Sequence, residues 1–241
     1  MTTTSVVVQN ATLLQDSAEY ANNFEANEVS MPYLLILQAM SPQVKKGPTK
    51  VDGAEEGDLY NSLTGELIEG AEGVDFIPCA YKKVFIEKTV DEKGIPADYV
   101  ATHHVKESAG VVGKKKQGVD FLGNGNVLVE VAQYFGLLVK QGGGIERVAI
   151  SMKGSQLKKS KTFNGIIASL MVNVDGKVFN PPMFSSSYKL KTEIESYETN
   201  TWYGWKIGGA TPVNPQLYAT AADFARSVRA GRAAVREEEI V

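Results

Sequence analysis

The sequence contains few of the side chains that carry catalysis or bind metals. Its 241 residues include one cysteine and two histidines. The single thiol, Cys79, excludes an internal disulfide and fits a reducing compartment. His103 and His104 are adjacent, and neighbours on a strand point to opposite faces, so they are poorly placed to hold one metal ion. The sequence therefore predicts no enzyme, no metal centre and no cofactor.

Signatures of other known sites are missing as well. The glycine-rich stretches GNGN (123–126) and QGGGIE (141–146) lack the lysine and hydroxyl residue of a phosphate-binding loop, and turns explain them better. The acidic run at 51–75 fits no calcium-binding loop and is interpreted as a solvated loop. A nuclease would have to depend on this run and the histidine pair, which makes it the weakest hypothesis.

Long apolar runs are also absent. No segment approaches the roughly 20 apolar residues that a membrane-spanning helix needs. The N-terminal stretch MTTTSVVVQNATLLQ has no basic residue, whereas a signal peptide begins with basic residues. We therefore expect a soluble cytoplasmic protein without a membrane partner.

Positive charge is scarce overall but unevenly distributed. The net charge is -3 and the pI is about 5.6, so the whole-chain balance does not favour nucleic-acid binding. Charges in residues 51–75 are all acidic, whereas those in residues 140–191 are mainly basic. Local fields matter more than net charge for a polyanion, so the basic segment is where we expect such a partner.

β-Branched and aromatic residues fill several segments that are bounded by glycine and proline. Residues 74–90 predict a long strand with Pro78 at an edge or a bulge. Hairpin turns are predicted near Thr64-Gly65 and at Asp175-Gly176. Residues 91–126 carry too many glycines and charges for a regular element and are expected to form a long excursion. These patterns predict a mainly β barrel or sandwich with extended loops.

Two segments favour helices. The segment beginning at Ser155, SQLKKSKTFNGIIASLMVNV, predicts a short helix with that serine as the N-cap. The C-terminal segment predicts the clearest helix, with Asn214 as its cap and Pro215 in its first turn. The chain divides accordingly into an N-terminal arm or peripheral segment (1–30), a β-rich core (31–212) and a C-terminal helix (213–241) with an acidic tip at residues 237–239.

Lysines interleaved with aromatic rings form the most distinctive pattern. Proteins that bind single strands combine cations that follow the phosphates with rings on which bases stack. Three clusters have this composition: Tyr81, Lys82, Lys83 and Phe85; Lys158, Lys159, Lys161 and Phe163; and Trp202, Tyr203, Trp205 and Lys206. Core aromatics beside solvated lysines would produce the same local pattern. Phe163 in particular is either a stacking ring or the anchor that packs its segment onto the barrel.

Six segments carry a resemblance to a known family: MPYLLILQAMSPQVKKG, GDLYNSLTGE, FIPCAYKKVFIE, SMKGSQLKKSKTFNGII, PPMFSSSYKLKTEIES and TWYGWKI. Together, within roughly residues 30–207, they resemble the single-stranded-DNA-binding replication and recombination proteins of tailed phages. The resemblance implies an OB-like β-barrel that coats single strands cooperatively in the host cytoplasm. It also implies an acidic C-terminal tail that recruits replication or recombination proteins.

Two functions are compatible with these observations. The first is sequence-independent binding of single-stranded DNA in phage replication or recombination. Its expected phosphate contacts are Lys82, Lys83, Lys158, Lys159 and Lys161, and its expected stacking rings are Tyr81, Phe163 and either Trp202 or Trp205. The second is a structural or assembly protein of the phage particle that binds no nucleic acid. Both functions leave self-association open.

Overall fold

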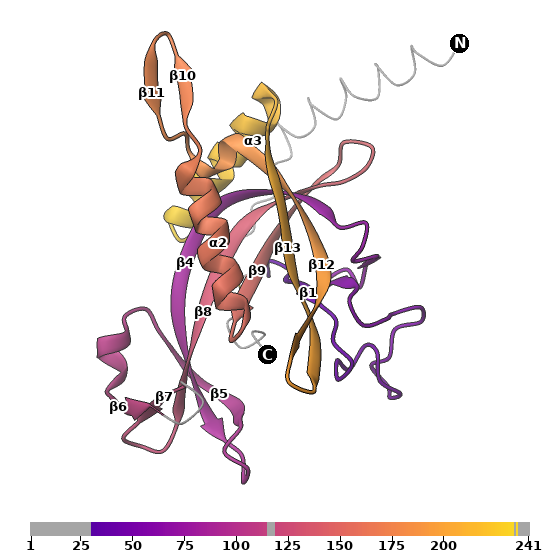
Figure 1. Ribbon diagram of the computed structural model, residues 1–241, viewed down its shortest axis with the longest axis vertical. Helices are drawn as coiled ribbons and strands as arrows, with labels where there is room; N and C mark the ends of the chain where they lie inside the picture. Colours follow the sequence, from indigo (N-terminus) through magenta and orange to yellow (C-terminus); the bar gives the residue numbers. More distant parts are fainter. Residues whose placement is uncertain (1–29, 115–118, 234, 236–241) are drawn as a thin grey trace.

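A long antiparallel sheet forms the body of the protein. The computed structural model in Figure 1 describes residues 30–114, 119–233 and 235. The central strands are β4 (Val74–Val90), β8 (Val127–Val139), β9 (Ile145–Lys153), β12 (Ser186–Tyr197) and β13 (Asn200–Pro212). They pair in the order β13-β12-β4-β8-β9 and curl into half a barrel. The expected mainly β architecture is therefore confirmed.

The two longest strands, β4 and β8, show how the sequence specifies this sheet. A bulge interrupts their pairing between Pro78 and Ala80, because proline has no backbone N–H to donate to the ladder. Side chains alternate along β8, so Tyr134 and Phe135 belong to two different buried clusters on opposite faces. At Gly136 a side chain would collide with the ring of Phe76, and glycine allows this close approach.

The C-terminal helix α3 (Pro215–Arg229) covers one face of the sheet. The Oδ1 atom of Asn214 accepts a hydrogen bond from the backbone N–H of Leu217 at 2.9 Å, as expected for an N-cap. Phe224 and Val228 are buried against the cluster that contains Phe135. The predicted C-terminal helix is thus confirmed. Residues 1–29 of the proposed N-terminal arm (1–30) and the acidic tip at residues 237–239 lie outside the described residues.

A second helix, α2 (Gln156–Ser169), packs on the other face. Phe163 lies between Tyr134 and Tyr188, with ring centroids 5.0 Å from each. The Tyr134 hydroxyl is 2.9 Å from the Ser160 hydroxyl and donates to Asn164 Oδ1 at 2.8 Å. The expected helix is present, but the backbone of Ser155 already has helical dihedral angles and its side chain makes no capping hydrogen bond.

A small sheet lies beside the open side of the half barrel. It contains β1 (Leu34–Ile36), β2 (Leu59–Asn61) and β3 (Leu67–Ile68) in that order. The β2 and β3 strands form the hairpin predicted near Thr64-Gly65. Tyr33, just before β1, bridges to Ala149 of β9, so the small sheet is attached to the edge of the large one.

The segment expected to be an irregular excursion is regular, so that prediction was wrong. It forms β5 (Pro96–His103), a 3-10 turn η1 (Lys106–Ala109), β6 (Val111–Lys114) and β7 (Asp120–Leu122). Strand β5 pairs with β4 and β7 pairs with β8, so the long strands provide the template. Phe85, Leu122 and Leu128 give this extension its own small buried cluster. Gly94, Gly110, Gly123 and Gly125 lie at turns or bends between these elements.

A separate hairpin projects from the end of α2 (Figure 1). It contains β10 (Val172–Val174) and β11 (Lys177–Phe179). Its turn residues, Asp175 and Gly176, have φ values of 51° and 79°, which is the left-handed backbone of a tight hairpin turn. The hairpin predicted at this position is therefore confirmed. A short 3-10 turn, η2 (Met183–Ser185), leads from the hairpin into β12.

Candidate nucleic-acid interface

Lys82 and Lys83, the neighbouring lysines of β4, lie on opposite faces of the sheet. Consecutive strand residues alternate, so Lys82 and Lys83 cannot line one groove. The Lys82 ammonium lies 5.1 Å from the centre of the Phe135 ring, on the face that α3 covers. Lys83 is exposed and forms a 3.0 Å ion pair with Glu130. The structure therefore separates these two expected phosphate contacts.

The three lysines of α2 also differ in their surroundings. Lys158 and Lys161 are exposed, and neither forms an ion pair within the described part of the chain. Lys159 instead points toward β12 and lies 2.7 Å from Glu193 and 3.1 Å from Glu195. Burial by itself lowers the pKa of Lys159, but the hydrogen bonds to the two carboxylates outweigh it and keep that pKa above its usual value. Lys158 and Lys161 are thus the lysines of this set that are available to an anion.

Burial divides the aromatic rings into two groups. Phe163 is fully buried and Trp205 is 2% exposed, so both are core residues. Phe163 is the anchor of α2, which leaves it no surface for a base. Tyr81 is 36% exposed, and Trp202 is also partly exposed. The Tyr81 ring lies 5.1 Å from that of Tyr134, which places it beside α2.

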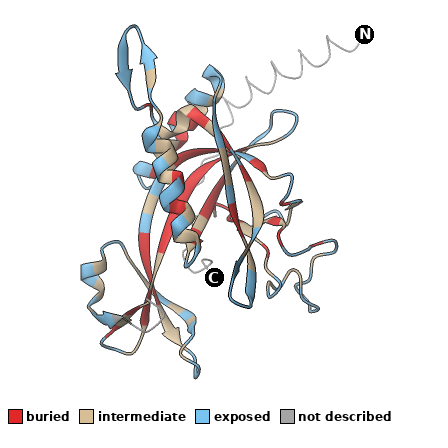
Figure 2. Ribbon diagram, in the orientation of Figure 1, coloured by how far each residue is buried: buried red, intermediate tan, exposed pale blue. Residues whose placement is uncertain are grey.

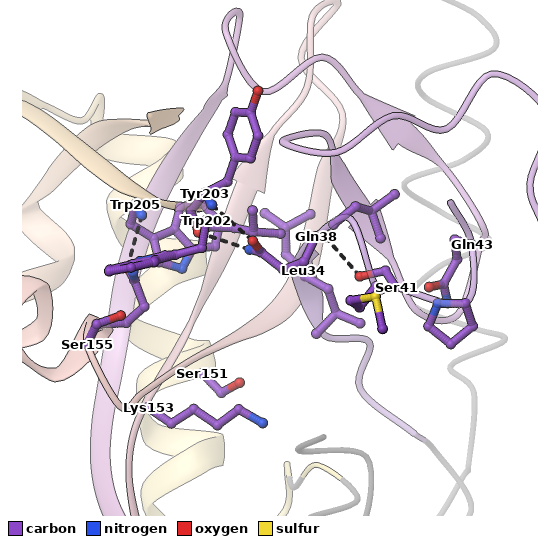
Figure 3. Close-up of a pocket in the computed structure, with 16 residues that line it drawn as sticks. Leu34, Gln38, Ser41, Gln43, Ser151, Lys153, Ser155, Trp202, Tyr203 and Trp205 are labelled. Carbon is purple, nitrogen blue, oxygen red and sulfur yellow. Dashed lines mark hydrogen bonds between the residues drawn. The ribbon is translucent and has the colours of Figure 1, made fainter. Parts of the chain in front are cut away.

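A pocket of about 530 Å³ opens where the outer edges of β9 and β13 do not pair with each other (Figure 3). We call it the seam pocket. It is lined by residues 34–38 and 40–43, by Ser151, Lys153, Ser155 and Gln156, and by Trp202, Tyr203 and Trp205. Its size is in the range of small-ligand sites, which usually combine an apolar wall with a few polar groups.

Two glutamine side chains hold the outer edge of β13 at this pocket. Gln38 Nε2 donates to the carbonyl of Tyr203, and the N–H of Tyr203 donates back to Gln38 Oε1, both at 2.9 Å. The N–H of Trp205 donates to Gln156 Oε1 at 3.0 Å. These amides replace the neighbouring strand that an edge strand lacks, so the pocket wall is held in one position.

Lys153, at the end of β9, is the cation of the seam pocket (Figure 3). It is half-buried, and its ammonium group has no hydrogen bond or ion pair with any other described residue. Burial, followed by repulsion from Lys88, lowers the pKa of Lys153 to about 8. A half-buried ammonium without a counter-ion is costly to the folded state and is frequently found at binding sites.

Trp202 and Tyr203 are the partly exposed aromatic residues that line the same pocket, and Trp202 has the larger ring. The indole of Trp202 is also held in place by a hydrogen bond: its N–H donates to Glu195 Oε2 at 3.1 Å, which fixes the ring orientation. A fixed ring and an unpaired lysine therefore line one cavity. Trp202 was among the residues expected from the sequence, whereas Lys153, Gln38 and Gln156 were not. The available signal was that Lys153 follows an apolar strand run, where a charge is unexpected.

His103 and His104 are not placed to bind one ligand together. His103 Nε2 lies 2.8 Å from Glu87 Oε2 in the extension, whereas His104 is exposed. Hydrogen bonds from Asn126 and Asn124 lower the pKa of the Glu87 carboxyl. Across residues 30–114, 119–233 and 235, no group of three or more His, Cys, Asp or Glu side chains could hold a metal ion. No helix in the same residues has the length and apolar character to cross a membrane.

The chain was compared with protein families, curated proteins and solved structures. Residues 2–234 match the model of the family described as Pam3 phage gp34-like protein. No curated protein and no solved structure matches the chain. The family description names a phage but no activity, so it confirms the expected phage origin without bearing on DNA binding. Because the match extends over nearly the whole sequence, the chain belongs to the Pam3 phage gp34-like family of phage proteins.

Proposed function

We propose that the protein binds single-stranded DNA without sequence preference during phage DNA replication or recombination, using an OB-like half barrel. The seam pocket would receive one nucleotide. Lys153 would contact its phosphate, and the partly exposed ring of Trp202 would stack on its base. The observation that carries this proposal is the pairing of an uncompensated lysine with a fixed indole in one pocket.

The surface beside the pocket supports the same function. Ser155, at the N-terminal end of α2, lines the pocket, so the positive end of a 14-residue helix faces it. Lys158 and Lys161 lie on the following turns of that helix and are exposed. Cations along a helix that starts at the pocket would follow the phosphates of a bound strand. Tyr81, beside the same helix, offers a second ring.

An oligo-dT titration tests this proposal. We expect tryptophan emission to be quenched on binding, and affinity to fall roughly tenfold between about 50 and 200 mM salt, because neutralised phosphates release counter-ions. Trp202→Ala should weaken binding by about 1–3 kcal/mol, the usual contribution of one stacked base. Tyr197→Ala is the matched control, since its ring is 68% exposed and does not line the pocket.

The same titration can also contradict the proposal. Folded protein that gives neither quenching nor an anisotropy change with labelled oligo-dT at low salt would rule out DNA binding. The structural or assembly role would then be the better hypothesis, and detection of the protein in purified phage particles would support it.

A further inference from the structure

The β10–β11 hairpin is largely exposed (Figure 2), and several of its exposed residues are apolar. Val178 is 61% exposed, and Met171, Val174 and Phe179 are also exposed. A two-stranded hairpin is marginally stable in water without a covering surface. Grouped exposed apolar residues on a projecting element are characteristic of interaction sites.

The hairpin is held in place at its base. The side-chain amide of Asn180 donates to the carbonyls of Leu170 at 2.7 Å and Ile167 at 3.0 Å, at the C-terminal end of α2. The Ile167 carbonyl also accepts the backbone N–H of Leu170 at 3.4 Å, and carbonyls at the C-terminal end of a helix commonly take such additional partners. Asn180 therefore couples the hairpin to α2, and the apolar residues are presented in a fixed direction.

A second feature of the chain has complementary chemistry. A groove of about 440 Å³ lies where β3 meets the start of β4 and the end of β8. Its apolar lining comes from Leu67, Ile68, Val74, Leu138 and Val139. We call it the Glu69/Glu72 groove, because these two exposed residues form no ion pair within the described part of the chain. None of the residues that line it comes from the hairpin of the same chain.

The other charges of the groove are already paired. Lys140 lies 2.6 Å from Glu66, and Lys189 lies 3.2 Å from Asp75. Glu69 and Glu72 therefore give the rim an excess of negative charge. The hairpin carries Lys177, an exposed lysine with no ion pair among residues 30–114, 119–233 and 235.

We propose that the β10–β11 hairpin of one copy docks in the Glu69/Glu72 groove of a second copy. Its apolar residues would cover the groove lining, and Lys177 would pair with the two free carboxylates. Strand β3 is an edge strand of its sheet, and both hairpin strands have a free edge, so backbone hydrogen bonds can add to the contact. Asp175, at the hairpin tip, would face the lysines of the same rim.

The contact has a consequence for assembly. Two different surfaces of the same chain meet, so each bound pair leaves one hairpin and one groove open for further copies. Such contacts produce open chains unless the rotation between copies closes a ring. A hairpin in a groove is a small interface, so we expect weak association, with a dissociation constant of about 10–100 µM.

Sedimentation velocity of the full chain, without DNA, tests the proposal. We expect the weight-average sedimentation coefficient to rise over about 5–500 µM at low salt, spanning the expected dissociation constant. Lys177→Glu should remove most of this rise, and so should the double variant Glu69→Lys with Glu72→Lys. The variant that carries all three changes should recover it, because the charges are complementary again. Lys93→Glu, at an exposed turn lysine, is the matched control and should behave as the wild type.

Two results would overturn the proposal. One is a wild-type sedimentation coefficient that does not change over the whole concentration range. The other is association that neither single-surface variant weakens, or that the combined variant fails to recover. Oligo-dT binding by the same variants is measured separately, so a failure of the DNA-binding proposal and a failure of this one are distinguished.

Discussion

Replacing Phe163 by alanine is expected to lower the free energy of unfolding by about 3–5 kcal/mol. The ring is fully buried between Tyr134 and Tyr188, so its removal leaves a cavity beneath α2 as well as losing apolar burial. In a chain of this size, the melting temperature should fall by roughly 10 °C. Chemical denaturation followed by circular dichroism measures the loss directly.

The same variant separates the two roles that the sequence left open for Phe163. If the ring anchors α2, oligo-dT binding measured well below the melting temperature is retained while stability falls. A stacking ring would give the opposite result, with binding lost at an unchanged melting temperature. Tyr197→Ala removes a ring of similar size that is 68% exposed, and its stability should change by no more than about 0.5 kcal/mol.

Elements that form through residues adjacent in the sequence were predicted correctly. Local turn chemistry predicted the hairpin at Asp175-Gly176, and a cap followed by proline predicted α3 at Asn214. The extension at residues 91–126 was not predicted, because its strands form only on the ends of β4 and β8. Glycine and charge counts describe the turns of that segment but contain no information about a template elsewhere in the chain.

The candidate site was predicted only in part for a similar reason. Gln38 and Tyr203 are 165 positions apart in the chain, and only the closing of the half barrel brings them together. Grouping residues by their position in the sequence also places neighbours on one surface, whereas Lys82 and Lys83 lie on opposite faces of the sheet. Phe163 and Trp205 are buried, so their rings are not accessible to a base. Among the expected residues, Tyr81, Lys158, Lys161 and Trp202 stay accessible, and Trp202 lines the seam pocket together with Lys153, which was not among the predicted contacts.

Replacing Lys153 by methionine is expected to change stability and binding in opposite directions. Methionine keeps most of the side-chain volume and removes a half-buried charge that has no partner in the described chain. We expect the free energy of unfolding to rise by about 2 kcal/mol at neutral pH. Affinity for oligo-dT should fall about tenfold, because a charged hydrogen bond to phosphate is lost. Lys158→Met, at an exposed lysine, should leave stability nearly unchanged.

The pH dependence of these two effects follows from the same lysine. Its pKa is about 8 in the folded protein, below the usual 10.5, so the folded state releases this proton before the unfolded state does. Between these values the unfolded state binds more protons, so wild-type stability rises with pH and the advantage of Lys153→Met shrinks. Affinity for DNA should instead fall as pH rises through about 8, because the free protein loses the charge that phosphate requires.

Arginine at position 153 provides the control for the pH argument. A guanidinium remains charged throughout this range, so Lys153→Arg should bind oligo-dT with little change between pH 7 and about 9, while the wild type weakens. Titrations at matched ionic strength measure the difference. If Lys153→Met binds as tightly as the wild type, or if the wild type and Lys153→Arg share one pH profile, Lys153 does not contact phosphate. A stability gain without any change in binding would then mark Lys153 as a buried charge that has no part in DNA recognition.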